Sequence, residues 1–210
     1  MRMRKKPNLG IRLERCESVI IKEPEKLCGK WNETFGGTCV HLEIGCGKGR
    51  FINTLAGQNP DILFIGIERE EGALVMAAEK AVESGLSNII FIDGDAVRLE
   101  EFFEHGELSR IYLNFSDPWP KTKHAKRRLT YRDFLSLYCK VLGDKGEIFV
   151  KTDNKGLYEF TLNELAACDL RMKNITFDLH STDFENVMTE YEERFSSQGM
   201  PIYRVEAYKR

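Results

Sequence analysis

The chain has no long hydrophobic run. None of the apolar segments in its 210 residues approaches the length that a membrane-spanning helix needs. The basic start, residues 1–6, leads into Pro7 and Asn8 with no hydrophobic stretch behind it, so we expect no signal peptide and no membrane partner. With 42% hydrophobic and 30% charged residues, the composition favours a folded globular protein over a disordered or fibrous one.

Closely spaced cysteines are also missing. No two of the six cysteines form a Cys-x-x-Cys pair, because they stand at positions 16, 28, 39, 46, 139 and 168. A chain of this size does not need disulfides to hold its core, so we expect free thiols in a reducing cytoplasm. The same spacing argues against a structural zinc site or an iron–sulfur cluster, and we expect no metal.

Linkers and internal repeats are absent too. No stretch is rich enough in Gly, Ser or Pro to divide the chain. The first 30 residues have weak periodicity. The sequence therefore predicts a basic amino-terminal arm, residues 1–30, followed by a single domain, residues 31–210, in a monomer or homodimer.

The small net charge of −2 hides an uneven distribution. Residues 1–15 carry six Lys or Arg against one Glu, and residues 121–128 carry five Lys or Arg and no acid. Each segment thus has a net charge of +5, and the rest of the chain must carry −12. Two basic segments on an acidic body indicate a polyanionic partner.

Strand-like and helix-like segments alternate along the chain. Apolar β-rich runs predict strands at residues 39–44, 62–67, 88–92, 110–115 and 147–151. Helical patterns lie at residues 49–57, 70–84, 98–103, 131–142 and 157–168. Two further strands, 173–180 and 202–208, flank a polar stretch, residues 183–197, that is compatible with a helix, and they are expected to form an antiparallel pair at one edge. This order predicts an α/β fold with a doubly wound, mostly parallel sheet.

A glycine-rich loop follows the first of these strands. Gly45, Gly47 and Gly49 let the backbone turn tightly and approach a ligand. A dinucleotide-binding loop would need a glycine where Arg50 stands, and a P-loop would need Ser or Thr after Lys48. The loop therefore matches neither a nicotinamide-dinucleotide site nor a nucleoside triphosphate site.

Acidic residues stand at the ends of three successive predicted strands. Glu43 precedes the glycine loop, where it suits a ligand ammonium and would repel a pyrophosphate. Glu68 can accept hydrogen bonds from ribose hydroxyls, and Asp95, followed by Ala96, can accept from an adenine amino group. Amine, ribose and adenine together describe S-adenosylmethionine.

The fourth predicted strand runs into Asp117-Pro118-Trp119-Pro120. Two prolines stiffen this loop, and Trp119 offers a stacking surface for a base. Behind it stand cationic side chains that predict binding to nucleic-acid phosphates: Lys121, Lys123, His124, Lys126, Arg127 and Arg128.

At these residues the chain resembles the bacterial tRNA (guanine-N7-)-methyltransferases over nearly its whole length. The matching segments are 43–49, Glu68, Asp95, 114–129, 151–154 and 189–192. The resemblance implies the seven-stranded class I methyltransferase sheet with one antiparallel edge strand, S-adenosylmethionine as cofactor, and a guanosine at tRNA position 46 as substrate. It also implies substrate binding by Asp153, Thr189, Glu190, Tyr191 and Glu192.

The chemistry of this reaction suggests a role for Asp117. Guanine N7 already bears a lone pair, so methyl transfer needs positioning more than a base. The base becomes cationic, and a fixed carboxylate beside it can stabilise that charge. We therefore predict that Asp117 is the catalytic residue and contacts the cofactor site, and that the target nucleotide is flipped out.

Three alternatives stay open. Asp-Pro-Pro-aromatic motifs at the same strand end serve methylation of exocyclic base amines, and Asp117 to Pro120 is similar to them. A catalytically idle RNA-binding module could keep the fold, although the intact acids argue against it. A nicotinamide reductase is weakened by Arg50, and the chain lacks the Pro-Cys pair of C5 cytosine transferases.

Overall fold

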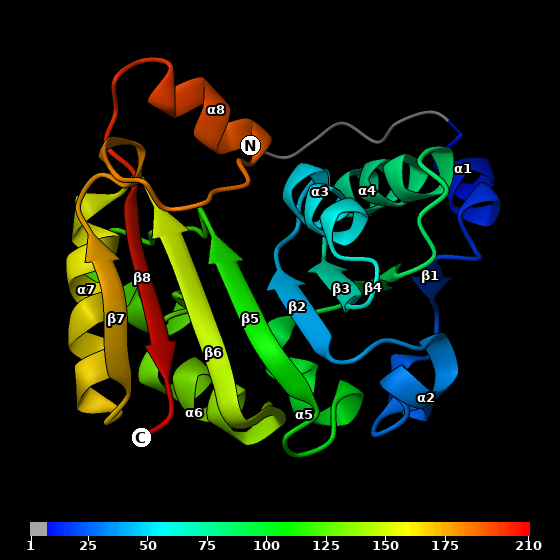
Figure 1. Cartoon of the computed structure of the whole chain (residues 1–210), viewed down its shortest axis with the longest axis horizontal. Helices are drawn as coiled ribbons and strands as arrows, with labels where there is room; N and C mark the ends of the chain where they lie inside the picture. The colour runs from blue at the N-terminus through cyan, green and yellow to red at the C-terminus, as the bar shows by residue number, and fades with distance from the viewer. Residues whose placement is uncertain (1–7) are drawn as a thin grey trace.

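The computed structural model describes residues 8–210. Eight strands form one sheet in the order β1-β4-β3-β2-β5-β6-β8-β7 (Figure 1). The strands are β1 (Ile20–Ile21), β2 (Val40–Ile44), β3 (Leu63–Glu68), β4 (Ile89–Asp93), β5 (Leu108–Asn114), β6 (Leu142–Thr152), β7 (Arg171–Thr176) and β8 (Tyr203–Tyr208). All neighbours pair in parallel except β8, which is antiparallel to both β6 and β7.

Eight α-helices and four short 3₁₀ helices connect these strands in the described part of the chain. The α-helices are α1 (Leu9–Arg15), α2 (Trp31–Phe35), α3 (Arg50–Gln58), α4 (Glu71–Glu83), α5 (Leu99–Phe102), α6 (Arg132–Val141), α7 (Lys155–Ala167) and α8 (Glu190–Ser196). The 3₁₀ helices are η1 (Pro24–Leu27), η2 (Ala96–Arg98), η3 (Thr122–Arg127) and η4 (Leu179–Ser181). The doubly wound α/β prediction is confirmed.

Two hydrophobic clusters cover opposite faces of the sheet. Successive strand residues point to opposite faces, so Leu42 joins the cluster with α5, α6 and α7, whereas Phe64 and Tyr112 join the cluster with α3 and α4. On the second face, α3 and α4 contact β3 and β4. In Figure 1, β5, β6 and β8 lie in front of α6 and α7, and no helix of the described residues crosses in front of them.

The structure adds one strand to the predicted seven. Strand β1 pairs in parallel with β4 and lies within residues 1–30, the predicted arm. Cys16 and Val19 beside it are buried, so the part of the arm from residue 8 onward packs on the sheet. The most basic part of the predicted arm, residues 1–7, lies outside the described residues.

The predicted antiparallel pair at one edge of the sheet is confirmed in β7 and β8. The antiparallel strand itself, β8, lies second from the edge, because the chain first forms β7 at the edge and then returns to place β8 between β6 and β7. Strand β6 is longer than the predicted residues 147–151, since Leu142 pairs with Leu108 at the start of β5, ahead of a register shift. Within residues 8–210 no helix is long and apolar enough to cross a membrane, and all six cysteines are free.

Candidate active site

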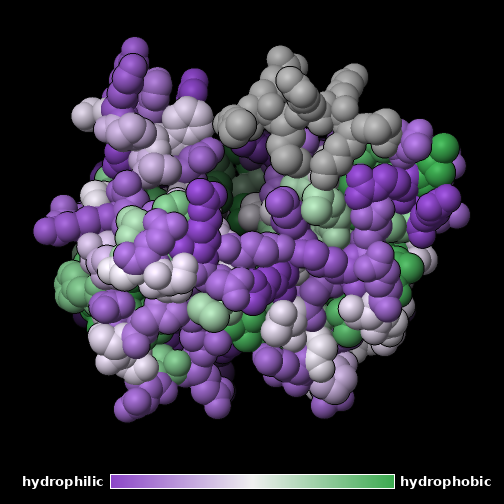
Figure 2. Space-filling model, turned by 90° about the horizontal axis from the view of Figure 1, so that it is seen from above, coloured by the Kyte–Doolittle hydropathy of each residue, from purple (hydrophilic) through white to green (hydrophobic). Residues whose placement is uncertain are grey.

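A cavity of about 620 Å³ lies at the carboxyl ends of the central strands. Strand β2 lies between β3 and β5, so the strand order runs outward from β2 in both directions. Open α/β sheets bind ligands at the carboxyl ends of the strands at such a point. Figure 2 looks onto this end of the sheet and shows a largely hydrophilic surface with a hollow near its middle. Five of the predicted cofactor residues line the cavity: Gly45, Glu68, Asp95, Ala96 and Asp117.

The glycine loop is held by the next strand. Glu68 accepts hydrogen bonds through Oε2 from the Gly47 amide at 2.9 Å, and through Oε1 from the amides of Arg69 and Glu70. Gly47 has a φ of +56°, which favours glycine. At Gly49, an added Cβ would lie 2.5 Å from the Cβ of Ala77, so this glycine allows α3 to approach α4. Neither Gly47 nor Gly49 lines the cavity.

Two hydrogen bonds orient the Asp95 carboxylate, one from a nearby backbone amide and one from an arginine. Its Oδ1 accepts from the Val97 amide at 3.2 Å, and its Oδ2 accepts from Arg69 at 2.9 Å. The Arg69 side chain is largely exposed, so this ion pair is screened by water. A ligand with a hydrogen-bond donor can therefore compete for Asp95.

Glu43 lies beneath the loop rather than on the cavity wall. It is 2% exposed, and its Oε1 accepts a hydrogen bond from Asn114 Nδ2 at 2.8 Å. Its Oε2 is buried with no hydrogen-bond partner in residues 8–210. Burial raises the pKa of Glu43 to about 8, against the effects of Asn114 and Lys151. Glu43 therefore reaches the cavity only through Asn114, which lines it.

The loop after β5 carries Asp117 on an unusual backbone. Phe115 and Trp119 have φ values of +53° and +40°, a region that side-chain-bearing residues rarely adopt. Arg128 holds this loop: its Nε donates to the Pro118 carbonyl and its Nη2 to the Trp119 carbonyl, both at 3.0 Å. Asp117 is exposed and has no hydrogen-bond or ion-pair partner in the described residues, so its carboxylate is free for a ligand.

The basic run divides into outward and inward side chains. Lys121, Lys123, Lys126 and Arg127 are exposed on or beside η3, and the last two also line the cavity. Arg127 lies 4.9 Å from the Trp119 ring centroid, and His124 packs edge-on against the same ring. Trp119 is thus covered on two sides. Arg128 faces the protein, as described above, so it positions the loop rather than offering a free cation.

Helix α8 carries the late motif, whose side chains have different roles. Thr189 caps the helix by accepting from the Glu192 amide, and Glu192 is fully buried against Lys151 at 2.6 Å. Glu190 pairs with Lys80. Tyr191 is 44% exposed, donates a hydrogen bond to Asp153 at 3.2 Å, and has its ring 5.1 Å from that of Phe115. Of the predicted substrate residues here, Tyr191 and Asp153 are those placed beside the Asp117 loop.

Three residues that organise the site lie in segments matching the family, yet sequence reasoning assigned them no role. Asn114 links Glu43 to the cavity, Phe115 forms a ring pair with Tyr191, and Lys151 anchors α8. Asn114 and Lys151 are polar residues at the ends of apolar strands, a signal that could have marked them. Phe115 carried no such signal, because its contact with Tyr191 joins residues 76 positions apart.

The residues present fit S-adenosylmethionine. Glu68 and Asp95 offer carboxylate acceptors along one cavity, at the successive strand ends where ribose and adenine were expected. An added Cβ at Gly45 would meet nothing within 4 Å, so the loop leaves open space at the cavity mouth. In residues 8–210 no group of three or more His, Cys, Asp or Glu side chains could hold a metal ion.

Comparisons with known proteins identify relatives of the chain. A family described as "Putative methyltransferase" matches residues 37–205. The tRNA (guanine-N(7)-)-methyltransferase of Brevibacillus brevis is 52% identical over 99% of this chain and 98% of its own length. The protein of the same name from Clostridioides difficile is 50% identical over 100% of both chains. Among solved structures, the 16S rRNA methyltransferase KamB is 13% identical with a TM-score of 0.65, over 85% of this chain and 91% of its own, which shows a shared fold.

Proposed function

The chain belongs to the tRNA (guanine-N(7)-)-methyltransferase family, and from that premise we propose that it transfers a methyl group from S-adenosylmethionine to N7 of a guanosine in tRNA. One observation carries the proposal beyond the family name. Acids suited to the cofactor, Glu68 and Asp95, line the same cavity as Asp117 and the cations Lys126 and Arg127. A methyl donor and a polyanionic acceptor can therefore meet there.

The cofactor's contacts follow from the donor and acceptor groups at the strand ends. Glu68 accepts from the ribose hydroxyls, Asp95 accepts from the adenine amine, and Ala96 and Gly45 leave room for the backbone to approach the ligand. Glu43 acts through Asn114 and keeps the floor of the site in place. When bound, S-adenosylmethionine supplies an electrophilic methyl group on a positively charged sulfur.

Asp117 is the residue we assign to catalysis. Guanine N7 attacks through its own lone pair, so no side chain has to remove a proton first. The purine gains positive charge as the methyl group arrives, and a carboxylate already in position stabilises that charge without reorganising. Arg128 holds the backbone on which Asp117 stands, which makes it a positioning residue.

The substrate guanosine contacts the aromatic pair of Phe115 and Tyr191. These rings stand on the Asp117 loop and on α8, so a purine flipped out of the tRNA can stack there while Asp153 orients Tyr191. Family resemblance supports position 46 in the variable loop. Thr189, Glu190 and Glu192 support this site by holding α8.

The exposed cations bind the tRNA backbone. Lys121, Lys123, Lys126 and Arg127 are exposed, and His124 lies among them on η3. Phosphate contacts of this kind position the RNA and carry no sequence information. A cytoplasmic location and a monomeric or homodimeric state, with no metal, remain parts of the proposal.

The test is methylation of tRNA by the purified full-length protein. Unmodified tRNA is incubated with methyl-labelled S-adenosylmethionine, digested to nucleosides and analysed, beside a matched tRNA in which guanosine 46 is replaced by adenosine. We expect 7-methylguanosine from the first tRNA and none from the second. A methylated exocyclic amine would favour the exocyclic-amine alternative. Binding of the tRNA without cofactor binding and without transfer of the label would favour the idle module.

A further inference from the structure

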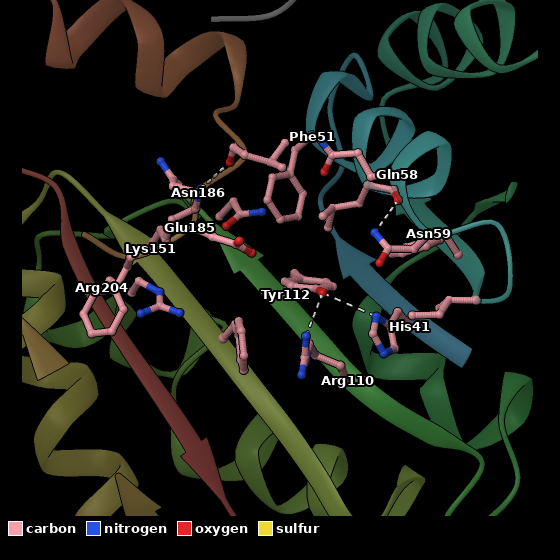
Figure 3. Close-up of a pocket in the computed structure, with 17 residues that line it drawn as sticks. His41, Phe51, Gln58, Asn59, Arg110, Tyr112, Lys151, Glu185, Asn186 and Arg204 are labelled. Carbon is pink, nitrogen blue, oxygen red and sulfur yellow. Dashed lines mark hydrogen bonds between the residues drawn. The ribbon is translucent and has the colours of Figure 1, made fainter. Parts of the chain in front are cut away.

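A cavity larger than the one that the predicted cofactor residues line is also present. A cavity of about 820 Å³ lies on the sheet face that α3 and α4 leave uncovered, between α3 and residues 184–187 (Figure 3). Its volume is in the range of small-molecule sites. Asn114 is the one residue that lines both cavities, and no predicted site residue lines this one. It is therefore a second cavity with its own set of lining residues.

Aromatic rings form much of the wall of this cavity. They come from α3, three strands and the loop before α8: Phe51, Phe64, Tyr112, Phe149 and Phe184. Tyr112 meets the rings of Phe51 and Phe149 edge-on, with centroids 5.1 and 5.6 Å apart. Phe184 is 39% exposed at the rim. A flat aromatic ligand can stack against such walls.

The charges that line this cavity are mainly positive. Arg110, Lys151 and Arg204 line it, against the single acid Glu185. Each of the three cations has a carboxylate partner elsewhere, namely Glu147, Glu192 and Glu206, and none of these acids lines the cavity. All three cations line the cavity while their carboxylate partners lie outside it, which favours an anionic ligand.

Two guanidinium groups have unused donors. Nη1 of Arg204 and Nε of Arg110 are buried and have no hydrogen-bond partner in residues 8–210. Arg204 is only 9% exposed, between the rings of Phe149 and Phe184 at 5.5 and 4.6 Å. Leaving a buried N–H unpaired is costly, so an acceptor is expected. Guanidinium forks match phosphate oxygens in geometry and charge.

Neutral polar groups stand at the other end of the cavity. Figure 3 shows His41, Gln58 and Asn59 on the side opposite Lys151 and Arg204. Burial, together with the nearby Arg110, lowers the pKa of His41 to about 4, so the imidazole is neutral at physiological pH. Neutral donors and acceptors of this kind suit the edge of a heterocyclic base.

We propose that this cavity binds a single nucleotide, with its phosphate held by the cations that line the cavity and its base among the aromatic rings. The nucleotide is either a residue of the bound RNA or a free mononucleotide. Binding of an RNA residue in this cavity rests on the proposed function, whereas binding of a free mononucleotide does not. The binding test below uses neither methyl transfer nor tRNA, so its failure is distinguishable from a failure of the proposed function.

The first experiment is calorimetric titration of the full-length protein with AMP and with GMP. S-adenosylhomocysteine is present at saturation, so that the cofactor cavity is filled. We expect one site with a dissociation constant below about 1 mM. Adenosine and guanosine, which lack the phosphate, should bind at least about tenfold more weakly. No saturable binding of either nucleotide at millimolar concentration would overturn the proposal.

Matched variants locate the site. Arg110→Gln and Phe184→Ala should each weaken AMP binding by about tenfold. The controls are Arg98→Gln, whose guanidinium also lies over a phenylalanine and pairs with glutamates, and Phe177→Ala, an exposed phenylalanine outside the cavity. Both controls should bind AMP like the parent. Because Phe184 is exposed, its variant is expected to fold, and unchanged binding by it and by a folded Arg110→Gln protein would refute the assignment.

A competition experiment separates the two sources. If unmodified tRNA displaces AMP from the saturated protein, the cavity takes a nucleotide of the RNA. If AMP and tRNA bind together, the cavity takes a free nucleotide. Both results support the site and differ only in its natural occupant.

Discussion

Two carboxylates near the cofactor cavity have opposite environments. Asp117 is exposed, lines the cavity and has no partner in the described residues. Glu43 is 2% exposed and accepts one hydrogen bond, from Asn114. An exposed carboxylate can contact a ligand directly, whereas a buried one acts through its neighbours. Substituting a neutral side chain should therefore affect methyl transfer at Asp117 and the pH dependence of stability at Glu43.

Replacing Asp117 should impair methyl transfer with little effect on stability. We expect Asp117→Asn to lower the single-turnover rate by about 10² or more, because it removes a fixed negative charge where the base becomes cationic. Affinity for S-adenosylhomocysteine and the unfolding midpoint should stay close to those of the parent. Asp144→Asn, at another exposed aspartate, is the matched control. A near-normal rate would make Asp117 an ordinary loop residue.

Replacing Glu43 should change how stability depends on pH. Its pKa is about 8 in the fold because of burial, against an ordinary value of 4.5. Between these values the folded state binds more protons than the unfolded state, so the free energy of unfolding falls as pH rises through that window. Glu43→Gln cannot titrate and escapes this loss.

Urea unfolding from pH 5 to pH 8 measures this effect. The stability of Glu43→Gln relative to the parent should rise across the range by at least about 1.4 kcal/mol, the equivalent of one pKa unit. Glu33→Gln, at an exposed position, should keep the parent's profile. Parallel profiles for the parent and Glu43→Gln would show that Glu43 is ionised in the folded protein.

At the scale of elements, α8 is tied to four parts of the fold by four consecutive residues. Glu190 pairs with Lys80 of α4, and Tyr191 bonds Asp153 after β6. Glu192 pairs with Lys151 of β6, and Glu193 pairs with Arg50 of α3. Only the Lys151–Glu192 pair is buried. Exposed pairs contribute little, so this pair should dominate the anchoring of α8.

Breaking the buried pair from one side should be costly. Lys151→Met leaves Glu192 without its main cation in a buried position, and we expect a loss of about 3 kcal/mol in the free energy of unfolding. The double variant Lys151→Met, Glu192→Leu should recover much of that loss, because no unpaired charge remains. Chemical denaturation of both variants is the measurement. Equal destabilisation by both would mean that packing, not charge, holds α8.

Helix η3 and its neighbours should control the salt dependence of tRNA binding. We expect the triple variant Lys123→Ala, Lys126→Ala, Arg127→Ala to flatten the slope of log affinity against log salt by about 2, since each lost phosphate contact removes roughly 0.7 to 0.9. Arg128→Ala should instead lower stability, because Arg128 bonds the Pro118 and Trp119 carbonyls. A slope unchanged in the folded triple variant would exclude these side chains from RNA contact.

At the scale of the whole molecule, ligand binding should stabilise the fold. The cofactor cavity joins residues from β2, β3, β5 and η2, so a ligand there bridges strands from both halves of the sheet. S-adenosylhomocysteine at 100 times its dissociation constant should add about 2.7 kcal/mol, which raises the unfolding midpoint by about 5 to 10 °C. Thermal unfolding with and without it is the test. Methionine at the same concentration is the control, and an unshifted midpoint would contradict the cofactor assignment.

Much of the fold could be predicted from local patterns in the sequence. Strands β2 to β5 were expected within two residues of their bounds, because each contains a short apolar run that ends in a polar residue or glycine. Strand β1 was not expected, since two residues, Ile20 and Ile21, carry too little pattern and are ordered by pairing with β4. The positions of Glu68 and Asp95 on the wall of one cavity were also expected from the ends of these strands.

The sequence by itself determined the order of strands and helices, the acids at the strand ends and the motifs of the methyltransferase family. Tertiary structure decided which side chains face a ligand. Arg128 and Glu192 look like RNA-binding residues in the sequence, yet both face inward, toward the carbonyls of the Asp117 loop and toward Lys151. Local patterns depend on residues a few positions apart, whereas these orientations depend on contacts between segments that meet only after the sheet has formed.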